Sequence, residues 1–344
     1  MGRKTVYNDV FSEELWEKVN PDNKDLLNDF VDYKKSSNKS SQTIYQYYQA
    51  MRIFFIWNLE YNNNKFFIDL KKREIIRYFN YTITEKKVSS NRMAFIRSVL
   101  SSFSNFIEMI LDDEYPNFRN IVKVTEPVIK ETVREKSVFT EEELMDCLQE
   151  LEKRKMYQEA CYLALGMCCG ARKSELLRFK VEYFKEEYIV FGCMFKTPEK
   201  IKTKGRSENG KMLYKYTFVQ PFIKYFTLWM KYREENNIQS EWLFVTKSLD
   251  GTYRQANVSN ANYWCQRIGE ILGKDFYSHS LRHYFVTNMK RKNLPDDIIV
   301  EIVGWADPTL IKVYNDLNTS DIMSKYFDES GIKENIQNGK LMDI

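Results

Sequence analysis

Apolar side chains recur at helical spacing over long stretches of this chain, and this periodicity limits its fold more than any other feature. Residues 23–113 contain four such stretches. The second of them, residues 43–61, carries a single apolar stripe made of Ile44, Tyr48, Met51, Phe55 and Leu59. Only 12 glycines and 7 prolines occur in 344 residues. The pattern predicts packed helices with short connections and disfavours a turn-rich β-sandwich.

The helical periodicity breaks at residues 115–137. Two prolines, several β-branched residues and mixed charges in this stretch are typical of an extended linker. Beyond it, residues 187–197 and 211–219 alternate as strands do, and the basic loop 198–210 joins them, which predicts a β-hairpin. Further helical patterns lie at residues 221–236, 257–272, 278–292, 295–303 and 305–317.

These elements predict a mainly α fold with a small antiparallel β-sheet in the second half of the chain. We expect residues 1–21 to form an N-terminal arm and residues 22–116 to form a helical domain. After the linker, residues 117–137, a second domain is expected over residues 138–330, followed by a polar tail at residues 331–344.

The formal charge of the chain is only +4, but the charges are unevenly distributed. Residues 34–106 hold thirteen lysines and arginines against four acids, and residues 196–216 hold seven against two. Either basic block alone is typical of a solvated surface. The charge therefore does not by itself indicate a nucleic-acid partner.

The cysteines and histidines predict neither disulfides nor a metal site. The six cysteines form no C-x-x-C pair, which favours free thiols in a reducing compartment. The two histidines, His279 and His283, lie four residues apart without a third ligand or the adjacent glutamate of a zinc protease, so no metal is expected. The N-terminus lacks the apolar core of a signal peptide, and no apolar run is long enough to span a membrane. We expect a cytoplasmic protein.

A set of chemically active residues recurs in order through the second domain. Arg172 lies in the sequence GARKSEL, His279 and Arg282 lie in HSLRH, Trp305 lies in GWAD, and Tyr314 follows nine residues after Trp305. Each residue taken alone has an ordinary structural explanation, since tyrosine occurs 23 times and arginines usually lie on surfaces. Their identity, order and spacing together are far more specific.

The set resembles the Arg, His-x-x-Arg, His/Trp and Tyr signature of the tyrosine recombinases, the phage integrase family. An acidic residue three positions after the first arginine also fits, and here it is Glu175. The resemblance extends over roughly residues 22–330. It implies a helical core-binding (SAM-like) domain followed by a tyrosine-recombinase catalytic domain, with duplex DNA held between them.

The resemblance implies a reaction in which Tyr314 attacks a DNA phosphodiester and forms a 3′-phosphotyrosine. Arg172 and Arg282 would bind the non-bridging oxygens, because two guanidiniums suit a phosphorane-like dianion. His279 would assist removal of the tyrosine proton, and Trp305 would donate its indole N–H. Glu175 would hold Arg172 or His279 in place. No cofactor or metal is implied, since the covalent intermediate conserves the bond energy.

The family also uses a lysine of the hairpin to protonate the leaving 5′-oxygen, and three candidates remain open. Lys196 is favoured because it lies 24 residues after Arg172 and precedes a threonine. Lys202 also precedes a threonine, and Lys204 lies in the same basic loop.

The implied partners are double-stranded DNA target sites and three further copies of the chain, which would form a homotetramer on a Holliday junction in a prokaryotic or phage context. Two alternatives share the pattern: a DNA-binding accessory protein with a decayed site, and a dimer or telomere resolvase with the same chemistry. Eight basic residues are candidates for contacts with DNA: Lys39, Arg52, Lys86, Lys87, Arg92, Lys202, Lys204 and Arg206.

Overall fold

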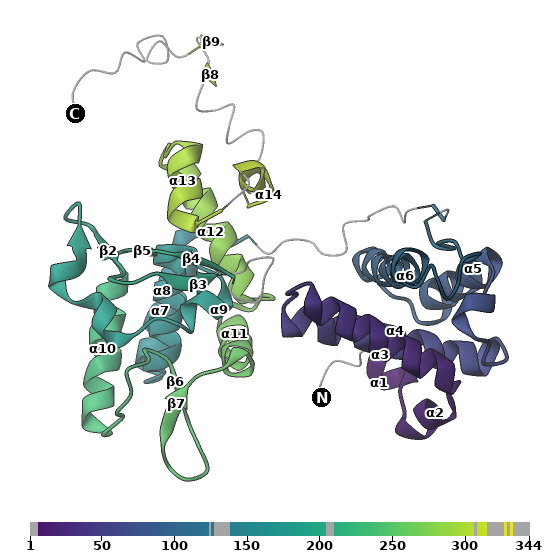
Figure 1. Cartoon of the computed structure of the whole chain (residues 1–344). Helices are drawn as coiled ribbons and strands as arrows, with labels where there is room; N and C mark the ends of the chain where they lie inside the picture. The colour runs from purple at the N-terminus through teal and green to yellow at the C-terminus, as the bar shows by residue number, and fades with distance from the viewer. Residues whose placement is uncertain are drawn as a thin grey trace. The chain divides into compact units, whose positions relative to one another are not determined.

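The computed structural model describes residues 6–123, 125–126, 138–203, 210–305, 308–314, 327–328 and 331–332. Contacts divide the chain into two compact units with a boundary between Glu135 and Lys136 (Figure 1). This boundary lies inside the stretch expected to be a linker. Each unit has its own hydrophobic core.

The described part of the N-terminal unit is helical. Its main helices are α3 (Pro21–Ser36), α4 (Ser41–Tyr61), α5 (Lys72–Asn80) and α6 (Ser90–Ile110). α4 and α6 each begin after a serine whose hydroxyl accepts a backbone N–H of the first turn, Ser40 and Ser89 respectively. Aromatic rings fill the core, where Phe67 packs edge-to-face against Phe103 with 4.8 Å between ring centroids.

The described residues 6–19 of the segment expected to form an N-terminal arm pack against this unit and include two short helices. They are α1 (Val6–Val10) and α2 (Glu13–Lys18). Val10 and Val19 are buried in the N-terminal core. The guanidinium of Arg52 on α4 lies 3.8 Å from the ring centroid of Phe11 and donates to the carboxylate of Glu13 over 3.2 Å. A cation–π contact and an ion pair therefore hold α1 and α2 on α4.

The described part of the C-terminal unit has eight α-helices and small antiparallel sheets (Figure 1). The helices are α7 (Glu141–Lys153), α8 (Tyr157–Cys169), α9 (Lys173–Leu176), α10 (Phe222–Glu235), α11 (Val258–Leu272), α12 (Ser278–Arg291), α13 (Asp296–Val303) and α14 (Ile311–Tyr314). α8 is apolar on nearly every side, and most of its residues are buried between α10, α12 and α7. It forms the centre of the core on which the other elements are placed.

The predicted hairpin is present as two consecutive ladders. β1 (Ile189–Val190), β2 (Met194–Lys196) and β5 (Tyr216–Phe218) form an antiparallel sheet, in which Lys196 pairs with Tyr216. Beyond it, β3 (Ile201–Thr203) pairs with β4 (Lys211–Leu213). The expected mainly α fold with small antiparallel sheets is confirmed.

Two further ladders were not predicted. β6 (Val245–Lys247) pairs with β7 (Tyr253–Gln255), and β8 (Phe327–Asp328) pairs with β9 (Gly331–Ile332). Strands of two or three residues are too short to show an alternating pattern.

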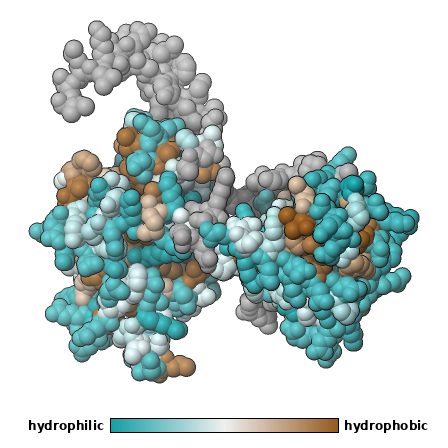
Figure 2. Space-filling model, viewed as in Figure 1, coloured by the Kyte–Doolittle hydropathy of each residue, from teal (hydrophilic) through white to brown (hydrophobic). Residues whose placement is uncertain are grey.

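The face of each unit that is seen in Figure 2 is largely hydrophilic, with scattered apolar patches. Within the described residues, no helix is both long and apolar enough to cross a membrane.

Candidate active site

Arg172 is placed by the turn that ends α8. Gly170 caps this helix with a φ of +55°, a left-handed conformation that glycine adopts most readily. A Cβ on Gly170 would lie 2.6 Å from Cδ1 of Phe285 on α12, so only glycine allows this close packing. The turn brings Arg172, at the start of α9, beside α12.

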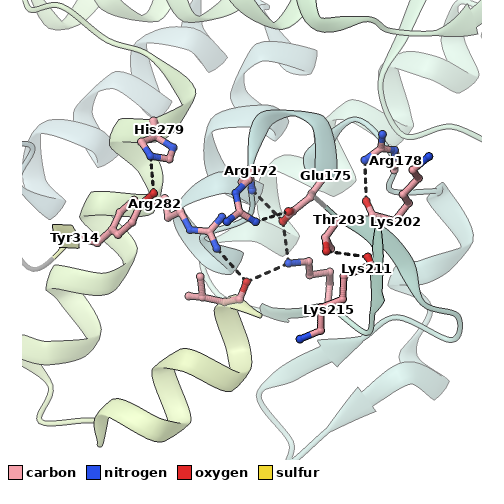
Figure 3. Close-up of polar contacts among 11 residues, drawn as sticks. Arg172, Glu175, Arg178, Lys202, Thr203, Lys211, Lys215, His279, Arg282 and Tyr314 are labelled. Carbon is pink, nitrogen blue, oxygen red and sulfur yellow. Dashed lines mark hydrogen bonds and ion pairs between the residues drawn. The ribbon is translucent and has the colours of Figure 1, made fainter. Parts of the chain in front are cut away.

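Glu175 binds Arg172 through both of its carboxylate oxygens and is fully buried. Its Oε1 accepts from Nη1 of Arg172 over 3.0 Å, and its Oε2 accepts from the Arg172 backbone N–H over 3.1 Å. The Nζ atom of Lys215 lies 2.8 Å from the same Oε2 (Figure 3). Burial by itself raises the pKa of Glu175, but the charges of Lys215, Arg282 and Arg172 outweigh it and hold the pKa below its ordinary value.

α12 carries His279 and Arg282, and its first residue anchors it in the core. Ser278 is hydrogen-bonded to the hydroxyl of Tyr162 on α8, with 2.6 Å between the oxygens. One turn later, the buried Arg282 donates from Nη2 to the carbonyl of Val303 over 3.1 Å. Burial, together with the charge of Arg172, lowers the pKa of Arg282 to about 10.

Gly304 ends α13 in a left-handed conformation and is followed by the buried Trp305. The Trp305 ring lies 4.9 Å from the ring of Tyr314 and 5.2 Å from the guanidinium carbon of Arg282, measured from ring centroids. The hydroxyl of Tyr314 lies 2.7 Å from Nε2 of His279 (Figure 3). A tyrosine hydroxyl, an imidazole and a guanidinium therefore meet at one place.

Several N–H donors at this place have no partner among the described residues. They are Nε and Nη1 of Arg282 and Nε1 of Trp305, all buried. A buried donor without an acceptor is costly, so a ligand that accepts from these N–H groups would be favoured. Beside a tyrosine hydroxyl, these donors can bind an anion, and the oxygens of a phosphodiester have the chemistry that suits them. Among the described residues, no cluster of His, Cys, Asp or Glu could hold a metal ion.

The structure brings Arg172, Glu175, His279, Arg282, Trp305 and Tyr314 into this one region. It does not bring Lys196, the lysine favoured as the proton donor, into this region. The ammonium of Lys196 lies over the rings of Tyr214 and Tyr216, at 4.9 Å and 5.9 Å. Its strand partner is Tyr216, so Lys196 lies on the face of the sheet opposite to that of the neighbouring Lys215. Lys202 is exposed on β3, whereas Lys204 lies outside the described residues.

The expected DNA contacts of the N-terminal unit differ in their surroundings. Lys39 and Lys87 are exposed. Lys86 pairs with an aspartate of α1 over 2.8 Å, and the guanidinium of Arg92 covers a phenylalanine ring of its own helix. Arg52 is buried in the contacts that hold α1 and α2, so its guanidinium is used within the protein. Arg206 lies outside the described residues.

Lys215 was missed by the sequence analysis. It precedes β5, its side chain is 1% exposed, and it pairs with Glu175. The available signal was weak: in the stretch predicted to be one strand, residues 211–219, Lys215 would share a face with Leu213 and Thr217, and a lysine is unexpected on a buried face. Burial lowers the pKa of Lys215, and the charge of Glu175 only partly opposes this effect.

Comparison with known proteins agrees with this geometry. Residues 137–321, more than half of the chain, match the phage integrase family. Residues 26–117 match the N-terminal SAM-like domain of phage integrases. The chain therefore belongs to the phage integrase family, whose members are tyrosine recombinases.

One relative is the SPbeta prophage-derived recombinase-like protein YomM of Bacillus subtilis (strain 168). It is 28% identical over 311 residues, which cover 88% of this chain and 90% of that protein.

Two solved structures show the same fold. XerH site-specific recombinase, in a post-cleavage complex with palindromic difH substrate, has a TM-score of 0.62 at 15% identity, with 90% of this chain and 97% of that chain covered. The lambda integrase tetramer bound to a Holliday junction has a TM-score of 0.60 at 18% identity, with 85% of this chain and 76% of that chain covered.

The buried pairs of Glu175 lead to a prediction about stability. Near neutral pH, Glu175→Gln lowers the free energy of unfolding by about 3–5 kcal/mol, because Lys215 stays buried without its counter-ion. The folded-state pKa of Glu175 is depressed, so its stabilisation is present above the ordinary pKa of about 4.3 and is lost as pH falls through the folded value. The difference in the free energy of unfolding between wild type and Glu175→Gln therefore becomes smaller below about pH 4.

Urea denaturation at several pH values measures this gap. Glu150→Gln is the matched control, because it removes an exposed pair with Arg154 in which 2.7 Å separates Nε from Oε1. That loss is expected to be much smaller than the loss in Glu175→Gln, because solvent screens an exposed ion pair. The prediction would be contradicted if Glu175→Gln and Glu150→Gln lost equal free energy of unfolding. It would also be contradicted if the difference between wild type and Glu175→Gln did not change with pH.

Proposed function

We propose that this chain is a site-specific DNA recombinase that cleaves and rejoins duplex DNA through a 3′-phosphotyrosine on Tyr314. The observation that carries the proposal is the hydroxyl of Tyr314 hydrogen-bonded to His279 beside buried N–H donors of Arg282 and Trp305. Membership of the phage integrase family supports it.

In the proposed reaction, the Tyr314 hydroxyl oxygen attacks the phosphorus of a phosphodiester. Its proton passes towards His279, whose Nε2 is already within hydrogen-bond distance. A bond from phosphorus to the tyrosine oxygen forms as the bond to the 5′-oxygen breaks. The 5′-hydroxyl of a partner strand then reverses the step, which leaves the number of phosphodiester bonds unchanged.

The two arginines and Trp305 would stabilise the transition state. Arg282 has two N–H groups and Trp305 one that are buried without partners in the described structure, and they suit the non-bridging oxygens of the phosphate. Arg172 adds a second guanidinium, and its side chain is one quarter exposed and held by Glu175. Charge aimed in advance at the developing dianion is usually the largest catalytic contribution.

The leaving 5′-oxygen needs a proton, and we assign this role to Lys202 in preference to Lys196. Lys202 is exposed on β3, whereas the ammonium of Lys196 is held over two tyrosine rings on the face away from Lys215. Approach of the hairpin to bound DNA would bring the lysine to the 5′-oxygen.

Double-stranded DNA and further copies of the chain are the proposed partners. Exposed lysines such as Lys39 and Lys87 would contact phosphates, which gives salt-dependent affinity with little sequence information. By analogy with the lambda integrase tetramer on a Holliday junction, four copies would act on two sites. A DNA-binding protein with a decayed site is disfavoured, because the chain retains Arg172, His279, Arg282, Trp305 and Tyr314.

Covalent trapping tests the proposal. Nicked duplexes tiled across the DNA that flanks the gene would release the fragment with the 5′-hydroxyl and leave the protein attached to its site. We expect an SDS-resistant adduct with wild type and none with Tyr314→Phe, because phenylalanine has no nucleophilic oxygen.

Tyr253→Phe is the matched control, since this tyrosine lies in β7 and should leave the adduct intact. An adduct that persists in Tyr314→Phe would contradict the nucleophile. DNA binding by wild type without an adduct on any flank would contradict the proposed activity.

A further inference from the structure

We propose that Lys215 is a positioning residue that couples the two arginines of the active site by bonding to a partner of each. The inference rests on the proposed function and adds a residue to its machinery. Lys215 would not touch the DNA but would keep Arg172 and Arg282 in the geometry that binds one phosphate.

The ammonium of Lys215 bonds to two acceptors, and each acceptor also bonds to one of the two arginines. The Nζ atom of Lys215 lies 2.8 Å from Oε2 of Glu175 and donates to the carbonyl of Val303 over 3.2 Å (Figure 3). Glu175 holds the guanidinium of Arg172, and the Val303 carbonyl also accepts from Arg282. The ammonium of Lys215 therefore links Arg172 and Arg282 through an acceptor that it shares with each of them.

The position of this ammonium is fixed from the backbone outward. The backbone N–H of Lys215 donates to the hydroxyl of Thr197 over 3.1 Å, and its carbonyl accepts from the Thr197 N–H over 3.0 Å. Gly304, which follows Val303, lies so near that a Cβ there would be 2.6 Å from Leu213 and 3.5 Å from Nζ of Lys215. Sheet and helix end therefore approach closely at this lysine.

Charge explains why a cation belongs here. Arg172, Lys215 and Arg282 face the single carboxylate of Glu175, so the cluster keeps a surplus of positive charge for a phosphate. Without Lys215, Glu175 would be neutralised mainly by Arg172 and would draw that guanidinium towards itself. The Val303 carbonyl would also lose one of its two donors, two residues before Trp305.

The rival role for a lysine at this place is proton donation to the leaving oxygen. Lys215 is enclosed, with a side chain that is 1% exposed and two protein acceptors on its ammonium. Titratable groups around it are Glu175 on α9, Arg282 on α12 and Cys169 on α8. Positioning and proton donation make opposite predictions when the substrate is modified at a single atom.

The experiment measures single-turnover cleavage at saturating duplex by the full chain, with Lys215→Met and Lys215→Gln beside wild type. Three substrates carry an ordinary scissile phosphate, a methylphosphonate that lacks its negative charge, or a 5′-bridging sulfur that leaves without a proton donor. We expect Lys215→Met to bind DNA within about 3-fold of wild type and to cleave the ordinary site about 100-fold more slowly. The defect should shrink on the methylphosphonate and persist on the 5′-thio substrate.

Lys202→Met is the matched control, because the proposed acid should lose its defect on the 5′-thio substrate. Lys215→Gln keeps an N–H donor without the charge, and it supplies the measurement if the methionine variant does not fold. Rescue of a Lys215 variant by 5′-sulfur would overturn positioning in favour of proton donation. Wild-type rates at saturation would show a purely structural role. Failure of the proposed function appears separately, as wild type that forms no Tyr314-dependent adduct.

Discussion

Glu175 is a carboxylate with no exposed surface, and the arrangement of the C-terminal unit depends on its pairing. A buried charge without a partner costs several kcal/mol, so this residue requires cations. They come from separate elements: Arg172 at the start of α9 and Lys215 before β5. Lys215 also bonds to the end of α13, where Arg282 of α12 shares the same acceptor. Pairing one carboxylate thus fixes three helices and a sheet relative to one another.

The same cluster carries more positive than negative charge, and this surplus suits the proposed reaction. Cations outnumber the single carboxylate, and buried donors of Arg282 and Trp305 have no acceptor among the described residues. Folding normally satisfies such groups, so each of these donors needs an acceptor, which a ligand can supply. A DNA phosphate would supply both the charge and the acceptors. In the proposed reaction, the hydroxyl of Tyr314 would then lie beside the phosphorus atom that it attacks.

Much of this architecture could be predicted from the sequence, because helices of ten residues or more show their periodicity. The spacing from Trp305 to Tyr314 and the HSLRH motif likewise identified residues that the structure brings together. Local patterns failed where tertiary contacts decide. Lys215 looks like one more lysine of a basic hairpin, and only the approach of α9 and α13 makes it part of the site.

The basic residues of the N-terminal unit show the same limit. Arg52 looks like a surface cation of an amphipathic helix, yet residues about forty positions earlier in the chain bury its guanidinium. Residues 1–21 were expected to form an N-terminal arm, and the described part of this segment includes the helices α1 and α2. Their packing depends on aromatic contacts with α4 that no local pattern reveals.

The most direct test of this account is a structure of Tyr314→Phe bound to a duplex that carries its cleavage site. The account predicts that non-bridging oxygens of one phosphate lie about 2.7–3.2 Å from Nε and Nη1 of Arg282 and from Nε1 of Trp305. Glu175 and Lys215 should remain paired beneath them. A scissile phosphate bound elsewhere, with these donors still without acceptors, would contradict the central claim.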